Sequence, residues 1–320
     1  MRLSIVIPLL NEQANLALLH QRLSAVTDKL GCQRQVIFVD DGSTDQSARI
    51  IAELAAKDPT VTGIEFSRNF GHEAASTAGL DHADGDAVVL MDGDLQDPPE
   101  LIEQLIARWR EGFDVVYAVR SDRRGESLFK RCSAWAFYRI LNMMSEVEIP
   151  RDTGDFRLMD RRVVTGLRQC RERARFIRGL VAWTGFKTTS VEYHRPGRHG
   201  GQTKYNPLKL LWLSLDAAVG FSILPLRVAT ALGFAVTLVS LVLVSIIVVQ
   251  KLFMQIQMPG YALLASGLFF LGGTQMLLLG VLGEYIGRIY RESQARPLYI
   301  IRRRSGESDQ RPPADGQIWP

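Results

Sequence analysis

Three oxygen-bearing side chains follow a short apolar run near the middle of the N-terminal half. The run is AVVLM, and Asp92, Asp94 and Gln96 occupy alternate positions directly after it. Mg²⁺ and Mn²⁺ prefer hard oxygen ligands, and such ions are commonly held by one or two carboxylates together with substrate phosphates. A D-x-D tripeptide alone is more often a solvated loop. At the end of an apolar strand, this spacing predicts a divalent-metal site at Asp92, Asp94 and Gln96.

Acidic turns also follow two earlier apolar runs. Asn11 and Glu12 come after LSIVIPL, and Asp41 and Asp45 come after QVIFVD. Neither turn has the glycine pattern of a dinucleotide fold or a P-loop, which argues against NAD enzymes and P-loop NTPases. An acidic pocket can still bind a nucleotide if a divalent cation bridges carboxylates and phosphates.

The elements that must position these turns alternate along the first 120 residues. Short runs rich in Val and Ile predict strands, and apolar residues at helical spacing predict helices between them. This alternation predicts an α/β fold with a mostly parallel sheet, whose ligands bind beyond the carboxyl ends of the strands. The expected strands are 3–9, 35–40, 61–67, 87–92 and 114–119, and the expected helices are 15–30, 44–57, 72–83 and 98–110.

The C-terminal third is very different in composition. The mean hydropathy of the whole chain is +0.02 although 22% of its residues are charged. Residues 228–250 and 261–283 contain no charged residue, and a helix needs about 20 apolar residues to cross a bilayer. We expect a two-helix transmembrane hairpin with spans at about 228–250 and 261–286. The net charge of +4 is too small to indicate a nucleic-acid partner.

Basic residues flank both apolar runs, so the positive-inside rule places both termini and the N-terminal domain in the cytoplasm. The preceding stretch mixes Leu, Trp and Phe with Lys209 and Asp216, which is typical of an interfacial amphipathic helix. Small residues in the second run permit close packing and a homo-oligomer. The expected parts are a cytosolic domain (1–205), an interfacial helix (206–227), the hairpin (228–290), and a basic juxtamembrane segment with a disordered tail (291–320).

The motifs resemble those of a known enzyme family. SIVIPLLNE, VDDGSTD and MDGDLQDPPE are similar to family 2 glycosyltransferases of GT-A fold. DTGDFRLMDRR, RHGGQTKYNPLKLLWLSLDAAVGFS and GEYIGRIYRE resemble polyprenyl-phosphate glycosyltransferases, the group of bactoprenol glucosyltransferases and dolichol-phosphate mannose synthase. The resemblance extends to about Pro297 and implies a location in the bacterial cytoplasmic membrane.

The resemblance also implies roles for individual residues. Leu10 stands where family members often carry an aromatic residue. The nucleotide-binding set is Pro8, Leu10, Glu12, Val39, Asp40, Asp41 and Asp92, and the metal ligands, for Mg²⁺ or Mn²⁺, are Asp92, Asp94 and Gln96. The residues assigned to catalysis are Asp92, Asp94, Asp155 and Arg131. The basic and hydroxyl residues assigned to the acceptor phosphate are Arg120, Lys130, Arg131, Ser133, Arg198 and Lys204.

The implied reaction is the inverting transfer of a sugar from a nucleoside diphosphate, with UDP-glucose as first choice, to undecaprenyl phosphate. The second pKa of a phosphate monoester is about 6, so the acceptor oxygen is already ionised and needs no strong base. Asp155 is then a base or an orienting group, and we favour orientation. Two alternatives are a processive polysaccharide synthase, which would need more spans, and a catalytically inactive membrane scaffold.

Overall fold

The computed structural model describes residues 1–120, 153–173, 175–193, 224–254 and 260–306. The chain divides into two compact units. The sheet unit consists of Met1–Ala134, Val147–Lys204 and Arg296–Pro320, and the helical unit consists of Trp135–Glu146 and Tyr205–Ala295. The C-terminal residues thus belong to the same unit as the N-terminal ones.

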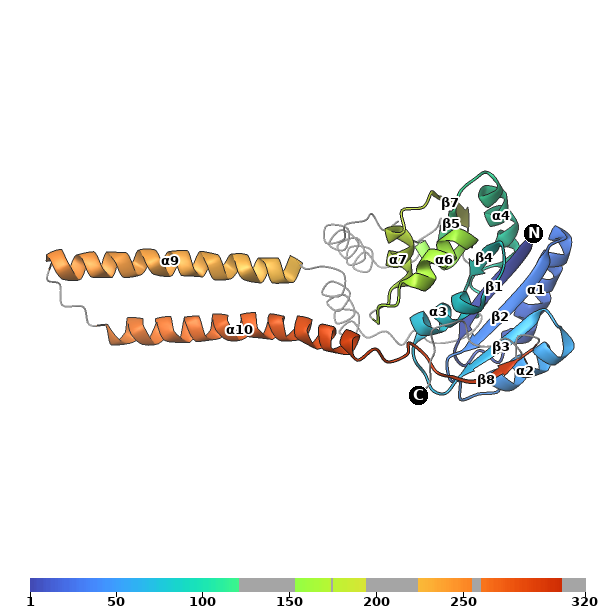
Figure 1. The fold of residues 1–320 in the computed structure, drawn as a ribbon, viewed down its shortest axis with the longest axis horizontal. Helices are drawn as coiled ribbons and strands as arrows, with labels where there is room; N and C mark the ends of the chain where they lie inside the picture. The colour runs from blue at the N-terminus through green and yellow to red at the C-terminus, as the bar shows by residue number, and fades with distance from the viewer. Residues whose placement is uncertain (121–152, 174, 194–223, 255–259, 307–320) are drawn as a thin grey trace. The chain divides into compact units, whose positions relative to one another are not determined.

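The sheet unit is built on one sheet with the strand order β7-β5-β6-β4-β1-β2-β3-β8 (Figure 1). Its four central strands, β4-β1-β2-β3, are parallel. On one side β6 pairs antiparallel with both β4 and β5, while on the other β8 pairs antiparallel with β3. The strands are β1 (Arg2–Leu9), β2 (Gln33–Asp40), β3 (Val61–Phe66), β4 (Ala87–Leu90), β5 (Val115–Arg120), β6 (Thr153–Asp160), β7 (Thr188–Tyr193) and β8 (Ile301–Ser305).

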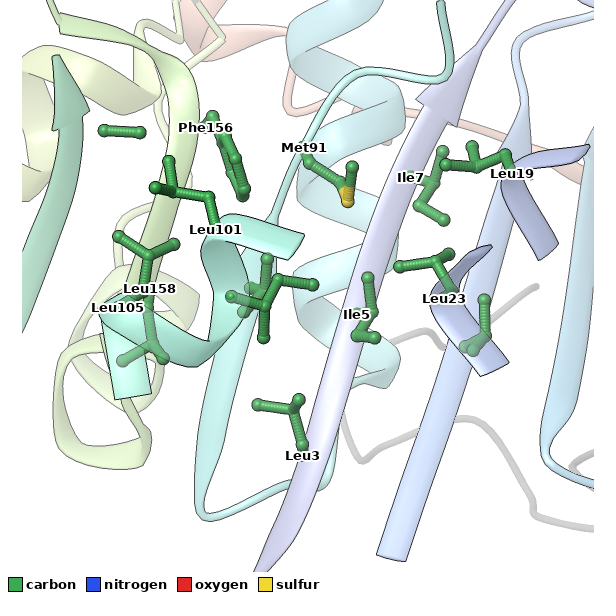
Figure 2. Close-up of a cluster of buried hydrophobic side chains, with 14 of the residues drawn as sticks. Leu3, Ile5, Ile7, Leu19, Leu23, Met91, Leu101, Leu105, Phe156 and Leu158 are labelled. Atoms are coloured by element: carbon green, nitrogen blue, oxygen red, sulfur yellow. The ribbon is translucent and has the colours of Figure 1, made fainter. Parts of the chain in front are cut away.

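Helices cover both faces of this sheet. Along β1, Leu3, Ile5 and Ile7 point to one face and Val6 to the other, because successive strand side chains alternate. The first face packs against α1 (Leu16–Leu30), α2 (Ser47–Lys57), η1 (Pro99–Leu101) and α4 (Ile102–Arg110). Figure 2 shows part of this core around Ile5, Leu23 and Leu105. The second face packs against α3 (His72–His82), α6 (Arg161–Gln169) and α7 (Ile177–Trp183).

Helix α3 approaches the sheet very closely at Gly79. A Cβ atom at this position would lie 2.1 Å from Cγ1 of Val6 in β1. The absence of a side chain therefore lets the helix pack against the central strands. This contact sets the position of α3 relative to the sheet. The first residue of α3, His72, thereby lies at the carboxyl edge of the sheet.

The predicted elements of the first 120 residues are confirmed. Each of the five expected strands and four expected helices is present with ends shifted by a few residues. Strand β5 is parallel to β7 but joins the rest of the sheet through antiparallel β6, so the sheet is mostly rather than wholly parallel.

The helical unit contains two long helices, α9 (Leu224–Met254) and α10 (Tyr261–Ser293). They pack against each other, and a Cβ atom at Gly233 would lie 3.6 Å from Cδ1 of Leu278. Among the described residues, no helix combines the length and the apolar character of a membrane span. The expected interfacial helix at 206–227 lies mostly outside the described residues.

Part of the expected basic juxtamembrane segment (291–320) forms a strand. Residues 301–305 form β8 and close the β3 edge of the sheet. The segment IRRRS has no apolar alternation, and its strand conformation comes from backbone pairing with β3 and from ion pairs of Arg302 and Arg303 with Glu65. Residues 307–320 lie outside the described part of the chain.

Candidate functional site

Strand pairing brings Asp92 and Asp155 together. Leu90 of β4 lies opposite Arg157 of antiparallel β6. Continuing this register beyond the end of β4 brings Asp92 next to Asp155. The start of β6 therefore lies at the same edge as the carboxyl ends of the parallel strands, where ligands of such sheets bind.

His72 completes a cluster with these two carboxylates. Its Nε2 atom lies 3.5 Å from Oδ2 of Asp155 and 3.7 Å from Oδ1 of Asp92. Among the described residues, His72, Asp92 and Asp155 form a group whose potential ligand atoms all lie within 4.8 Å of one another. Both acids were predicted as site residues, whereas His72 was not.

Asp155 is held by two arginines. Arg178 of α7 donates from Nε to Oδ1 at 2.8 Å and from Nη2 to Oδ2 at 2.7 Å. Fully buried Arg157 donates to Oδ1 at 3.2 Å and also to the carbonyl oxygens of Gly154 and Asp155. Burial alone would raise the pKa of Asp155, but the bonds from Arg178 and His72 and the nearby positive charges hold it far below its ordinary value. Asp155 is therefore a fixed negative charge and a poor proton acceptor.

Asp92 has the opposite electrostatic environment. Burial, followed by the charges of Asp97, Asp155 and Asp94, raises the pKa of Asp92 to about 7, although His72 acts in the other direction. Burial would lower the pKa of His72, but the bond to Asp155 and the charges of Asp92 and Asp155 raise it to about 9. Burial and the neighbouring carboxylates thus both disfavour the charged form of Asp92.

The turn after β4 has a defined internal structure. The backbone of Leu95 adopts a positive φ of 60°, a conformation that is uncommon for a residue with a side chain and often found at functional turns. Asp94 accepts the backbone N–H of Gln96 at 3.0 Å. Asp97 accepts the hydroxyl of Tyr193 at 2.9 Å and the N–H of Asp92 at 3.3 Å. Within the described residues, Asp94 and Gln96 follow Asp92 in this turn but are not members of the His72 cluster.

The other predicted nucleotide residues lie at the ends of β1 and β2. Buried Asp41 accepts backbone N–H groups from Phe70 at 2.7 Å and Gly71 at 3.0 Å. Asp40 accepts the N–H and the hydroxyl of Ser43. Pro8 and Val39 are buried strand residues, while the side chain of Leu10 is 40% exposed.

Asn11 and Glu12 join the turns after β1 and β2. Asn11, with a positive φ of 59°, accepts the N–H of Thr44 at 2.8 Å and donates its own N–H to Ser43 at 2.8 Å. The N–H of Glu12 bonds Ser47 at 3.0 Å. These reciprocal bonds hold the two turns in register, a role that the sequence did not reveal for Asn11.

Most residues assigned to the acceptor phosphate have no described position. Arg120 is the last residue of β5. Lys130, Arg131, Ser133, Arg198 and Lys204 lie outside the described residues. Their assignment stays a prediction.

Arg157 and Arg178, which sequence reasoning missed, are the basic residues that the structure places beside Asp155. The neighbouring GDFR motif was the signal that could have pointed to Arg157.

Comparison with known proteins agrees with the described motifs. The glycosyl transferase family 2 model matches residues 4–167. Glycosyltransferase YkcC of Bacillus subtilis is 46% identical over 96% of this chain and 95% of its own length. The bactoprenol glucosyl transferase of Shigella phage SfV is 42% identical over 94% of this chain and 98% of its own length.

Among solved structures, mannosyl-3-phosphoglycerate synthase from Rubrobacter xylanophilus aligns with 69% of this chain and 73% of that chain, at 18% identity and a TM-score of 0.47. The family model covers most of β1, all of β2 to β6 and, with them, His72, Asp92 and Asp155. The chain therefore belongs to glycosyltransferase family 2 and is a glycosyltransferase.

Proposed function

We propose that the protein transfers a sugar, with UDP-glucose as the first donor to test, to the phosphate of undecaprenyl phosphate. The observation that carries this proposal is the 42% identity to a bactoprenol glucosyl transferase across nearly the full length of both chains. A shared acceptor is the simplest reason for similarity that includes the C-terminal apolar helices. The acidic turns at the carboxyl ends of the strands suit the binding of a nucleoside diphosphate together with a cation.

The residues around Asp92 fit a divalent cation. Asp155 has both oxygens bound by arginines and offers little free negative charge. Asp92 and Asp94 lie in the same turn, where burial and then the neighbouring carboxylates raise the pKa of Asp92. We propose that Asp92, Asp94 and Gln96 hold Mg²⁺ or Mn²⁺ there. Such an ion would supply Lewis-acid stabilisation of the charge that develops on the leaving diphosphate.

In the proposed reaction, an oxygen of the acceptor phosphate attacks the anomeric carbon and the nucleoside diphosphate leaves from the opposite side. This geometry inverts the anomeric configuration. Because the acceptor oxygen is already ionised, no proton needs to be removed from it. The fixed negative charge of Asp155 then orients His72 and Arg178, whose positive charges favour the approach of one anion towards another.

The acceptor phosphate needs further cations and hydrogen-bond donors close to the anomeric carbon. We propose Arg120, Lys130, Arg131, Ser133, Arg198 and Lys204 for this role, as their positions in the sequence suggest. Arg178, 30% exposed beside Asp155, is the described cation best placed to join them.

We further propose that α9 and α10 form a transmembrane hairpin that gives access to a lipid acceptor. Among the described residues, no helix combines the length and the apolar character of a span, so the hairpin is a proposal. It is supported by the uncharged runs 228–250 and 261–283 and by large apolar side chains exposed on both helices. Phe234 is 71% exposed, and Leu264 is 73% exposed. Such extended apolar surfaces are unfavourable in water. The proposed location is the bacterial cytoplasmic membrane with the sheet unit on the cytoplasmic side.

The test uses the purified full-length protein with undecaprenyl phosphate, Mn²⁺ or Mg²⁺ and a panel of UDP- and GDP-sugars. We expect transfer of one sugar to each acceptor, and loss of transfer when EDTA removes the metal. Addition of many sugars to one acceptor would support the processive alternative. Absence of both transfer and metal-dependent UDP binding would support the scaffold.

A further inference from the structure

The segment that follows α10 in the chain packs against β3 and the residue after it, next to the predicted nucleotide site. Strand β8 pairs with β3 in the register Gly63↔Ser305 to Phe66↔Ile301. The pairing continues past the end of β3, where Ser67 donates its N–H to the carbonyl of Ile300 at 3.0 Å. Figure 1 shows β8, in orange-red, beside β3.

Tyr299, just before β8, is the anchor of this segment. Its side chain is 7% exposed, and its ring lies nearly parallel to that of Phe66, with 5.2 Å between the ring centroids. Its hydroxyl donates to Asp81 of α3 at 2.9 Å. Stacked rings bury large apolar surfaces and fix the relative orientation of the two elements that carry them.

The stack continues into residues 67–71. Phe66 meets Phe70 edge to face, with 5.6 Å between centroids and an interplanar angle of 87°. Phe70 and the next residue, Gly71, donate their backbone N–H groups to Asp41. A continuous series of contacts thus joins Tyr299 to the carboxylate of Asp41.

Close backbone packing makes this loop sensitive to small shifts. Gly42 has a positive φ of 73°, and a Cβ atom there would lie 2.6 Å from the carbonyl carbon of Arg68. The turn after β2 and the loop after β3 therefore touch backbone to backbone. The loop ends at Gly71, directly before His72 of the cluster formed by His72, Asp92 and Asp155.

We propose that Tyr299 is a positioning residue for the donor nucleotide, acting through Phe66 and Phe70 on Asp41. The inference rests on the proposed function in one respect, namely that Asp41 belongs to the nucleotide pocket. It adds that residues beyond the apolar helices form part of the support of that pocket. Truncation of the chain before Tyr299 would accordingly affect the donor site.

The test compares substitutions in the full-length protein in detergent. Tyr299→Phe keeps the ring stack and loses only the bond to Asp81, whereas Tyr299→Leu loses the stack. Arg303→Gln, which breaks an exposed ion pair with Glu65 and leaves the stack intact, is the matched control. We measure UDP affinity by calorimetry in the presence of Mn²⁺, and KM separately for the sugar donor and for the lipid acceptor.

We expect Tyr299→Leu to weaken UDP binding by about tenfold, equivalent to about 1.4 kcal/mol, and to raise the donor KM with the acceptor KM unchanged. Tyr299→Phe and Arg303→Gln should stay within about twofold of the wild type. If Tyr299→Leu does not fold, Phe70→Leu tests the next link, because Phe70 is only partly buried. It should weaken UDP binding in the same way.

Wild-type affinity in the folded Tyr299→Leu or Phe70→Leu variant would overturn the inference and leave the proposed function standing. Equal increases in both KM values would also overturn it, because they indicate general damage. Absence of UDP binding by the wild-type protein would overturn the proposed function and this inference with it.

Discussion

Asp155 and Arg178 form a bidentate ion pair. Nε of the arginine lies 2.8 Å from Oδ1 and Nη2 lies 2.7 Å from Oδ2 of the carboxylate. Paired donors of this kind fix the orientation of a carboxylate as well as its charge. The pair joins β6 to α7, which are separated in the chain by α6. A carboxylate held in this way fits the orienting role that we propose for Asp155 better than the role of a base.

Asp155→Asn should lower turnover at least about tenfold while UDP binding stays within about twofold of the wild type. The amide keeps the shape of the side chain but loses the charge that orients His72 and Arg178. Misplaced positive charges at these two residues lower transition-state stabilisation rather than ground-state binding of UDP. Turnover of the purified protein and UDP calorimetry check this result. Asp160→Asn, at the other end of β6, is the control. Equal turnover in Asp155→Asn and the wild type would contradict the orienting role.

The sequence predicts the central sheet well because its strands are apolar runs closed by turns, as in β1 and β2. It predicts β6 and β8 poorly. TGDFRLMD and IRRRS carry many charged residues, and their strand conformation is decided by pairing with β4 and β3, far away in the sequence. Long-range pairing of this kind leaves no local periodic signal.

The same reason separates the predicted from the missed site residues. Asp41 and Asp92 directly follow apolar strands, so the fold class alone places them at the ligand-binding edge. Arg178 reaches Asp155 only through the packing of α7, and Tyr299 reaches Asp41 through two aromatic rings. Neither residue lies in a motif whose spacing reports that contact.

Metal binding should depend on pH through Asp92. With a pKa of about 7 in the metal-free protein, Asp92 is mostly protonated below pH 7, and a cation must displace that proton. The apparent Mn²⁺ affinity should therefore fall by up to about tenfold for each pH unit below 7 and level off above it. Calorimetry between pH 6 and 8 in buffers of different ionisation enthalpy measures both the affinity and the proton release.

Asp92→Asn should remove most of this proton release, whereas Glu111→Gln, an exposed carboxylate at the end of α4, should leave it unchanged. A Mn²⁺ affinity that stays constant from pH 6 to 8 would show that Asp92 does not lose a proton when the metal binds.

Gly79→Ala should lower the thermal unfolding midpoint of the sheet unit by several degrees. The new methyl would lie 2.1 Å from Cγ1 of Val6, and overpacking of a core costs about 1–3 kcal/mol. This exceeds the gain of about 1 kcal/mol from replacing glycine by alanine in a helix. Val6→Ala in the same chain should restore part of the loss. Gly166→Ala in α6, where no atom lies within 4 Å of the new Cβ, should keep or raise the midpoint, and a similar loss there would refute the steric explanation.

Leu241→Arg should reduce membrane integration of the full-length protein. Leu241 lies within the uncharged part of α9 and is 65% exposed. An arginine near the centre of a span costs about 2.5–3.5 kcal/mol on the insertion scale. Resistance to alkaline carbonate extraction measures the effect. Leu18→Arg, on an exposed position of α1, should extract like the wild type. If α9 instead lies in water, the arginine replaces an exposed leucine at no cost, and Leu241→Arg and the wild type would both be released by carbonate.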